Sequence, residues 1–261
     1  MESTTAERTG GVPADQERAL PKEIVIRCSR WTPSVGGKAQ VKQYTVPYVK
    51  GMTVLDALLY VKENIDPSLS FRYSCRMGIC GSCGMLVNGR PMLACETQIT
   101  ELPPKPVETE PLSNYDPIRD LATDFSDFFA HYRFVKPYLI REDTAEQDST
   151  TIQYPQTERD RLQYLQFSYC IMCGLCDAAC PPYAMDTEYL GPQALAAAYR
   201  WMADTRDEGR AERASAVDQP HGCWQCHVAQ TCSVVCPKGI DPALGIQLLK
   251  RLLLFRSIAK Q

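Results

Sequence analysis

Hydrophobic positions near the start of the chain alternate with polar ones, which is the period of a half-buried β-strand. Ile24, Ile26 and Cys28 fall on one face of such a strand, and Tyr44 and Val46 alternate in the same way further along. The two runs predict a β-hairpin. Because Cys28 occupies one of the apolar positions, we expect its thiol to be buried as a small hydrophobic group.

The apolar positions that follow change to helical spacing. Thr53 is a predicted helix N-cap. The apolar residues after it are Val54, Leu55, Leu58, Leu59 and Val61. Two strands followed by a helix match the start of a β-grasp fold. Residues 102–109 are rich in proline and predict a loop that leaves this first domain.

Helical spacing also marks the second half of the chain. Leu121 and three phenylalanines recur at i, i+4, i+7 and i+8, which predicts an amphipathic helix over residues 121–129. Further helices are predicted over residues 158–167 and 194–202. After Pro242, leucines form one apolar stripe beside basic residues. Such a stripe is typical of a helix that packs in a core or on a partner subunit, or that lies at a membrane surface.

Composition excludes some classes of protein. The 261 residues are 44% hydrophobic and 23% charged, as in ordinary globular proteins, and they are enough for two domains. A net charge of −3 gives no reason to expect a nucleic-acid partner. Residues 1–21 are polar, lack a targeting pattern and predict a disordered extension. No apolar run approaches the roughly 20 residues that span a bilayer, so we expect any membrane attachment to depend on other subunits.

Cysteine changes the picture most, because thirteen cysteines without a secretory signal point to metal ligation in a reducing compartment. The densest group is CIMCGLCDAACP, residues 170–181, with the bacterial-ferredoxin spacing C-x2-C-x2-C-x3-C-P. One tight turn aims the first three thiolates at one iron–sulfur cubane, whereas the fourth ligates a different cluster. The motif therefore predicts a second copy.

That copy lies between residues 226 and 237, with Ala229 where one sulfur is expected. Crossing the ligands, as in two-cluster ferredoxins, gives two sets. One set is a complete [4Fe–4S] site formed by Cys170, Cys173, Cys176 and Cys236. The other keeps three thiolates, which suits a [3Fe–4S] cluster, and is formed by Cys180, Cys226 and Cys232.

A different motif lies in the first half of the chain. Its spacing, C-x4-C-x2-C followed by a more distant fourth cysteine, is that of plant-type [2Fe–2S] ferredoxins. The predicted ligands are Cys75, Cys80, Cys83 and Cys95. Glycines at 78, 81 and 84 let backbone N–H groups approach the cluster sulfurs. Residues 85–94, with Asn88-Gly89 at their centre, predict a hairpin that returns the fourth ligand.

Two other uses of cysteine compete with this interpretation. Paired CxxC motifs also bind zinc, but a structural zinc takes four ligands and has no use for four cysteines packed into one such run. A disulfide framework is typical of small secreted scaffolds, much shorter than this chain. Cys28 and Cys223 remain unassigned, and Cys223 lies outside the spacing of the repeat.

Three segments together carry a resemblance to a known family. SFRYSCRMGICGSCGMLVNGRPMLAC, CIMCGLCDAACPPYAMDTEYLGP and CHVAQTCSVVCPKGIDP resemble the iron–sulfur subunit of succinate dehydrogenase and fumarate reductase, and the likeness covers residues 24–249. The resemblance implies an α+β chain with a β-grasp [2Fe–2S] ferredoxin domain over residues 22–115. It also implies an α-helical, bacterial-ferredoxin-like domain over residues 116–261 that holds the [4Fe–4S] and [3Fe–4S] clusters.

The resemblance further implies a path for electrons between the FAD of a flavoprotein subunit and membrane quinone. Membrane anchor subunits would hold the chain peripherally on the cytoplasmic face of the bacterial membrane. In this family the dicarboxylate chemistry belongs to the flavoprotein, and no residue here is a candidate catalytic acid, base or nucleophile. Pro181, Met185 and His227 are candidates for the quinone pocket. Ala184-Met185 replaces a Trp pair of many succinate dehydrogenases and favours menaquinone.

Two rival functions remain open. One is the iron–sulfur subunit of another flavin-linked dehydrogenase, such as a glycolate-oxidase-like complex, although the plant-type motif argues against it. The other is a zinc-bound structural protein, which would be colourless rather than brown. The direction of the reaction is not readable from the ligands, because succinate oxidation and fumarate reduction use the same cysteines.

Overall fold

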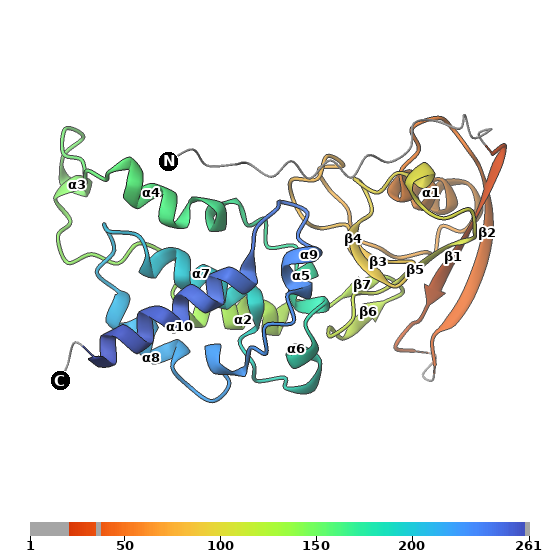
Figure 1. Ribbon diagram of the computed structural model, residues 1–261. Helices are drawn as coiled ribbons and strands as arrows, with labels where there is room; N and C mark the ends of the chain where they lie inside the picture. Colours follow the sequence, from red (N-terminus) through yellow and green to blue (C-terminus); the bar gives the residue numbers. More distant parts are fainter. Residues whose placement is uncertain (1–20, 35–37, 259–261) are drawn as a thin grey trace, which may run out of the picture.

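The computed structural model describes residues 21–34 and 38–258, with side chains to residue 255. Apart from Pro21, the extension predicted over residues 1–21 lies outside the described residues. A β-sheet occupies one end of the molecule and helices occupy the other (Figure 1). This arrangement confirms the predicted α+β fold class.

The sheet holds five strands in the order β2-β1-β5-β3-β4. β1 pairs with β5 in parallel, and the other neighbours are antiparallel. The strands are β1 (Glu23–Arg30), β2 (Gln40–Pro47), β3 (Gly84–Val87), β4 (Arg90–Leu93) and β5 (Val107–Glu110). Helix α1 (Val54–Tyr60) begins at Thr53, whose side chain accepts from Asp56 N in a capping box. The predicted hairpin, helix N-cap and 85–94 hairpin are therefore confirmed.

The loop predicted over residues 102–109 is wrong at its end. Val107 begins β5, a central strand that pairs with both β1 and β3. Val107 and Thr109 are buried, whereas the alternate residues Glu108 and Glu110 are exposed. This strand carries one large apolar side chain, so its position is fixed by the ladders on both sides rather than by a hydrophobic pattern.

The helix predicted over residues 121–129 begins later than expected. Residues 117–123 instead form a two-stranded ribbon of β6 (Pro117–Arg119) and β7 (Ala122–Thr123). The carboxylate of Asp124 accepts from Ser126 N at 2.8 Å, and helix α2 runs over Ser126–Phe134. Leu121 packs in the core of the sheet domain, so its apolar side chain serves that core and not a helix face.

The helical end is built around α7 (Gly191–Met202), which packs against α10, α2 and α8. The remaining helices are α3 (Ala145–Asp148), α4 (Glu158–Tyr164), α5 (Leu175–Ala178), α6 (Pro181–Met185), α8 (Arg210–Val217), α9 (Thr231–Val234) and α10 (Pro242–Ile258). Helices predicted over residues 158–167 and 194–202 are present as α4 with its 3-10 extension and as α7. Ile246, Leu249 and Leu253 of α10 are buried in this core, which favours the packing interpretation of the leucine stripe.

Short helix α5 joins the two ends of the molecule. Its Leu175 and Ala178 are buried in the core of the sheet domain. Across the same contact, Lys238 Nζ lies 3.7 Å from Glu96 Oε1. Because α5 lies inside the first cysteine run of the helical end, this contact fixes the cysteine sites relative to the sheet (Figure 1).

Candidate iron–sulfur sites

The first cysteine group lies in the loop before β3 and directly after β4. Backbone N–H groups of this loop point at its sulfurs. Cys75 Sγ accepts from Ile79 N and Cys80 N, both at 3.3 Å, and Cys95 Sγ accepts from Gly78 N at 3.3 Å. Donors aimed at sulfur stabilise thiolate and sulfide charge, so this loop fits an iron–sulfur cluster.

Glycine is required in this loop at two positions. Gly78 has φ +68°, and a Cβ there would lie 1.9 Å from Glu96 Oε1. Gly81 has φ +73°, and a Cβ there would lie 2.8 Å from Cys173 Cβ. The loop of the first site therefore touches a cysteine of the helical end directly.

Different surroundings give two thiols of the first site very different pKa values. The Ser82 hydroxyl and nearby backbone N–H groups lower the pKa of Cys80 to about 6. Burial raises the pKa of Cys83 to about 12. A buried thiol loses its proton when it ligates a metal, whose charge replaces the missing solvation.

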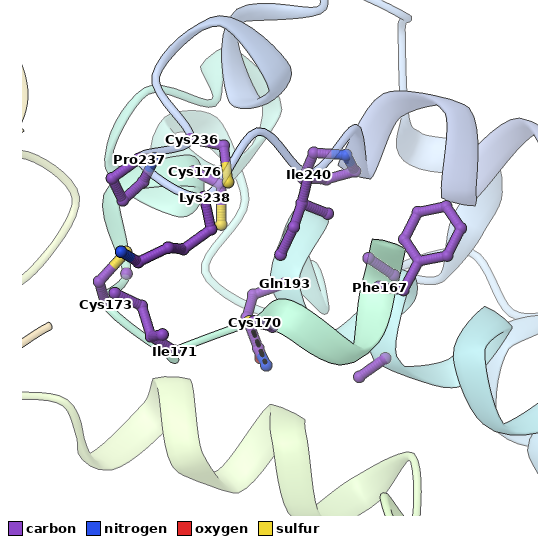
Figure 2. Close-up of a pocket in the computed structure, with 14 residues that line it drawn as sticks. Phe167, Cys170, Ile171, Cys173, Cys176, Gln193, Cys236, Pro237, Lys238 and Ile240 are labelled. Atoms are coloured by element: carbon purple, nitrogen blue, oxygen red, sulfur yellow. Dashed lines mark hydrogen bonds between the residues drawn. The ribbon is translucent and has the colours of Figure 1, made fainter. Parts of the chain in front are cut away.

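The second group surrounds one pocket at the helical end. Its four cysteines are Cys170, Cys173, Cys176 and Cys236, the set obtained by crossing the two repeats. Figure 2 shows their side chains around one hollow, with Pro237, Lys238 and Ile240 closing it from the second repeat. The structure thus brings together residues that are more than 50 positions apart in the sequence.

Two polar residues that contact cysteines of this pocket were not expected from the sequence. Gln193 is 3% exposed, and its Nε2 donates to Cys170 Sγ at 3.9 Å. Asp177 is 1% exposed and accepts from Gln193 N at 3.0 Å, and burial raises the pKa of its carboxyl to about 7. Both contacts depend on the start of α7 meeting the cysteine loop, which no local motif encodes.

The third group consists of Cys180, Cys226 and Cys232. Burial raises the pKa of Cys180 to about 12, with smaller contributions from negative charge on Asp177, Cys232 and Cys226. Cys180 and Cys226 lie in the same packed core of the helical end. The second repeat is tied to the first where Thr231 Oγ1 donates to Ala179 O at 2.8 Å. Lys250 Nζ on α10 donates to Cys226 O at 3.0 Å.

The two repeats have matching backbones. Met172 and Gly174 have φ +52° and +75°, and Val228 and Gln230, at the same places in the second repeat, have φ +59° and +61°. Ala229 stands between the latter two, as a cysteine stands between the former. The loop therefore keeps the shape of the three-cysteine loop in the first repeat, although its own sequence supplies one sulfur fewer.

These geometries favour clusters over single metal ions. In the described ranges, no three Cys, His, Asp or Glu side chains converge closely enough to hold one metal ion. The cysteines instead line a hollow, as ligands of a multi-iron cluster do. Four thiols around one hollow are therefore an arrangement that fits an iron–sulfur cluster.

The remaining cysteines are buried elsewhere. Cys28 is fully buried in the core of the sheet domain, as its alternating position predicts. Cys223 is fully buried in the core of the helical end, and burial raises the pKa of its thiol to about 12.

The three quinone candidates lie next to the third group in the sequence and are all exposed. Pro181 begins α6 directly after Cys180, and Met185 ends that helix with 87% of its surface exposed. His227 follows Cys226 and is exposed as well. The geometry leaves their role in quinone binding a prediction.

Comparison with known proteins agrees with this arrangement. A family model described as "2Fe-2S iron-sulfur cluster binding domain" matches residues 25–130, and one described as "4Fe-4S dicluster domain" matches residues 166–240. The chain is therefore an iron–sulfur protein with a ferredoxin-type domain followed by a dicluster domain.

Similar proteins indicate a particular family within this class of iron–sulfur proteins. The chain is 45% identical over 227 residues to the fumarate reductase iron–sulfur subunit of Mycobacterium tuberculosis, across 87% of this chain and 91% of that one. It is 42% identical over 229 residues to that of Haemophilus influenzae, across 85% and 89%. The Mycobacterium smegmatis Sdh1 complex in the apo form contains a chain of similar structure, with a TM-score of 0.79 and 26% identity over 91% of this chain and 98% of that one.

The chain belongs to the family of fumarate reductase and succinate dehydrogenase iron–sulfur subunits. The predicted family is therefore confirmed, and with it a role as the electron-transfer subunit of such an oxidoreductase. Across residues 21–34 and 38–258, no helix combines the length and apolar character needed to cross a membrane.

Proposed function

We propose that this chain passes single electrons between the FAD of a flavoprotein subunit and membrane quinone, in a succinate:quinone or quinol:fumarate oxidoreductase. Anchor subunits hold it on the cytoplasmic face of the membrane. Residues 22–115 carry the first centre, and residues 116–261 carry the other two. The observation that carries the proposal is the pocket in Figure 2, because its four cysteines come from two separate repeats in the crossed order.

The ligand sets follow from that crossing. Cys75, Cys80, Cys83 and Cys95 hold [2Fe–2S]. Cys170, Cys173, Cys176 and Cys236 hold [4Fe–4S], and Cys180, Cys226 and Cys232 hold [3Fe–4S]. When bound, the clusters supply one-electron redox couples whose potentials depend on cluster type and on hydrogen bonds to sulfur.

The protein keeps its three sites close to one another. Gly81 of the first loop lies against Cys173 of the second site. Cys176 lies on α5, and Cys180 follows that helix, so the second and third sites share one short segment. Such continuity is what a path of successive electron transfers needs.

Exposed apolar side chains mark the two ends of this path. Met77 and Ile79, in the loop of the first site, are 70% and 58% exposed. Met185 and Val234, beside cysteines of the third group, are 87% and 72% exposed. Apolar exposure of this kind is typical of surfaces that a partner covers. These ends fit a flavoprotein at the first site and the anchor subunits with quinone at the third.

Pro181, Met185 and His227 are proposed to line the quinone pocket, and the Ala184-Met185 pair favours menaquinone. The test compares His227→Gln with the unmodified complex in two assays, quinone turnover and reduction of a soluble dye. We expect quinone turnover to fall while dye reduction stays unchanged. An equal loss of both activities contradicts a role at the quinone.

The ligand crossing is tested with Cys236→Ser and Cys180→Ser in the intact complex. We expect Cys236→Ser to remove the four-iron EPR signal and Cys180→Ser to remove the three-iron signal, although the two residues belong to the opposite repeats. Iron and acid-labile sulfide analysis of the wild type provides the control. Zinc in place of iron, or loss of the signals in the uncrossed order, contradicts the proposal.

The alternative, another flavin-linked dehydrogenase, is tested by substrate. We expect the purified complex to oxidise succinate or to reduce fumarate, and the ratio of the two rates gives its direction. Oxidation of a 2-hydroxy acid without either activity favours the alternative.

A further inference from the structure

Tyr189 carries a buried hydroxyl for which the described part of the chain provides no hydrogen-bond partner. The residue is 0% exposed and lies just before α7. Its backbone is fixed by Tyr189 N donating to Asp186 O at 3.2 Å and by Leu190 N donating to His221 O at 3.0 Å. The ring packs edge-on to Tyr183, with centroids 6.4 Å apart. The side chain therefore has little freedom to turn its hydroxyl elsewhere.

The core around this residue contains cysteines of the third group. Tyr189, Cys180 and Cys226 belong to the same packed cluster of the helical end. Burial raises the pKa of the Tyr189 hydroxyl, and negative charge on Cys226, Cys180, Asp177 and Cys232 acts in the same direction. The hydroxyl is therefore buried in the core that holds two of the three cysteines of the site.

A hydroxyl in this position is unfavourable unless it meets an acceptor. A buried donor without a partner destabilises the folded protein, and native proteins contain few of them. Phenylalanine would fill the same space without this penalty. The acceptors that the site offers include sulfur atoms, either cysteine thiolates or the sulfides of a bound cluster.

We propose that Tyr189 is a positioning residue of the third site, whose Oη–H donates a hydrogen bond to sulfur there and raises the reduction potential of that centre. The inference rests on the proposed [3Fe–4S] assignment. A hydrogen bond to sulfur is stronger when sulfur carries more negative charge, as it does in the reduced state. The bond therefore favours the reduced form, in the way that hydrogen bonds to sulfur tune iron–sulfur potentials generally.

The test is Tyr189→Phe in the intact complex, with redox titration of the three-iron EPR signal. We expect the midpoint to become more negative. At the wild-type midpoint, the ratio of reduced to oxidised centre is expected to fall about threefold to tenfold, since a net hydrogen bond contributes about 1 kcal/mol. A tenfold change corresponds to about 59 mV for a one-electron couple. The four-iron midpoint stays unchanged in the same sample.

Tyr199→Phe is the matched control. Tyr199 is 6% exposed in the same core, and its hydroxyl donates to Gln163 O at 3.4 Å rather than facing cysteine. We expect this variant to leave the three-iron midpoint unchanged. Pulsed EPR in D2O gives a second readout, because the coupling of one exchangeable deuteron to the centre is expected to disappear in Tyr189→Phe and to persist in Tyr199→Phe.

An unchanged midpoint together with an unchanged deuteron coupling in Tyr189→Phe overturns the inference. Should that variant fail to retain the cluster, a high-resolution structure of the wild-type complex decides, and Tyr189 Oη more than 4 Å from every sulfur overturns it. Absence of a three-iron signal in the wild type is a different result, since it overturns the assignment of the third site.

Discussion

Asn114 provides a sharp test of how the two ends of the molecule are held together. Its Nδ2 donates to Asp177 O at 2.9 Å, to Ala178 O at 3.1 Å and, at the longer distance of 3.4 Å, to Cys180 O. These carbonyls lie at and just after the end of α5, which carries Cys176 and precedes Cys180. The side-chain amide of Asn114 therefore stabilises the helix that joins the second and third sites. Asn114→Ala removes these bonds.

The expected loss in the free energy of unfolding follows from the geometry of Asn114. Loss of two hydrogen bonds of normal length costs about 1 kcal/mol each. Asn114 also has φ +66°, a left-handed conformation that costs alanine about 1–2 kcal/mol and that asparagine tolerates better. The free energy of unfolding should therefore fall by about 2–4 kcal/mol. Because 1.4 kcal/mol is a factor of ten, the unfolding rate should rise by about tenfold or more if these bonds are absent from the transition state.

The assay follows loss of visible cluster absorbance in urea, under anaerobic conditions, as a rate of unfolding. Asn114→Asp, nearly isosteric, should be at least as harmful, because a carboxylate would face three carbonyl oxygens. Asn64→Ala serves as control, since Asn64 Nδ2 donates only to Tyr60 O on an exposed helix surface. An Asn114→Asp complex that unfolds within a factor of two of the wild type refutes the reasoning.

Three further predictions concern the sites and their surroundings. Ala229→Cys should convert the three-iron centre to a four-iron one, because the loop already has the backbone of the three-cysteine loop in the first repeat; iron analysis and EPR test this, and a persistent three-iron signal contradicts it. Gln193→Leu, which removes the donor to Cys170 Sγ, should make the four-iron midpoint more negative in a redox titration and leave the three-iron midpoint unchanged. The bond to Asp186, 2.8 Å away, raises the pKa of His221 above its ordinary 6.5, so the pair stabilises the fold fully below about pH 6.5 and loses this effect as pH rises through the raised pKa. The thermal midpoint of His221→Gln should thus differ most from the wild type at low pH, and a difference that grows in alkali is the contrary result.

The four cysteines that line the pocket in Figure 2 are one of the sets predicted from the sequence, and the reason is geometric. Ligands spaced two residues apart are held by one turn, so Cys170, Cys173 and Cys176 meet almost independently of the rest of the fold. The crossed partner Cys236 was also predictable, since the fourth position of the run cannot reach the same centre. The structure brings these four to one pocket.

Features that depend on long-range packing were not predictable. Strand β5 overlaps the end of the predicted loop, because only Val107 and Thr109 of this strand are buried and the flanking β1 and β3 determine its place. Leu121 fits a helical period but packs in the sheet core. Gln193 reaches Cys170 only because α7 approaches the cysteine loop in space, and it belongs to no motif.

The hydrogen bond from Lys250 Nζ to the carbonyl of Cys226 ties the loop of the second repeat to α10. Val228 and Gln230 sit in left-handed backbone without the freedom of glycine, so their loop needs support from outside itself. That support comes from α10, through the bond that Lys250 Nζ donates. The loop between Cys226 and Cys232 is therefore braced only while α10 is folded against it. Local unfolding of α10 would release this loop, whereas the strands of the sheet domain keep a core of their own.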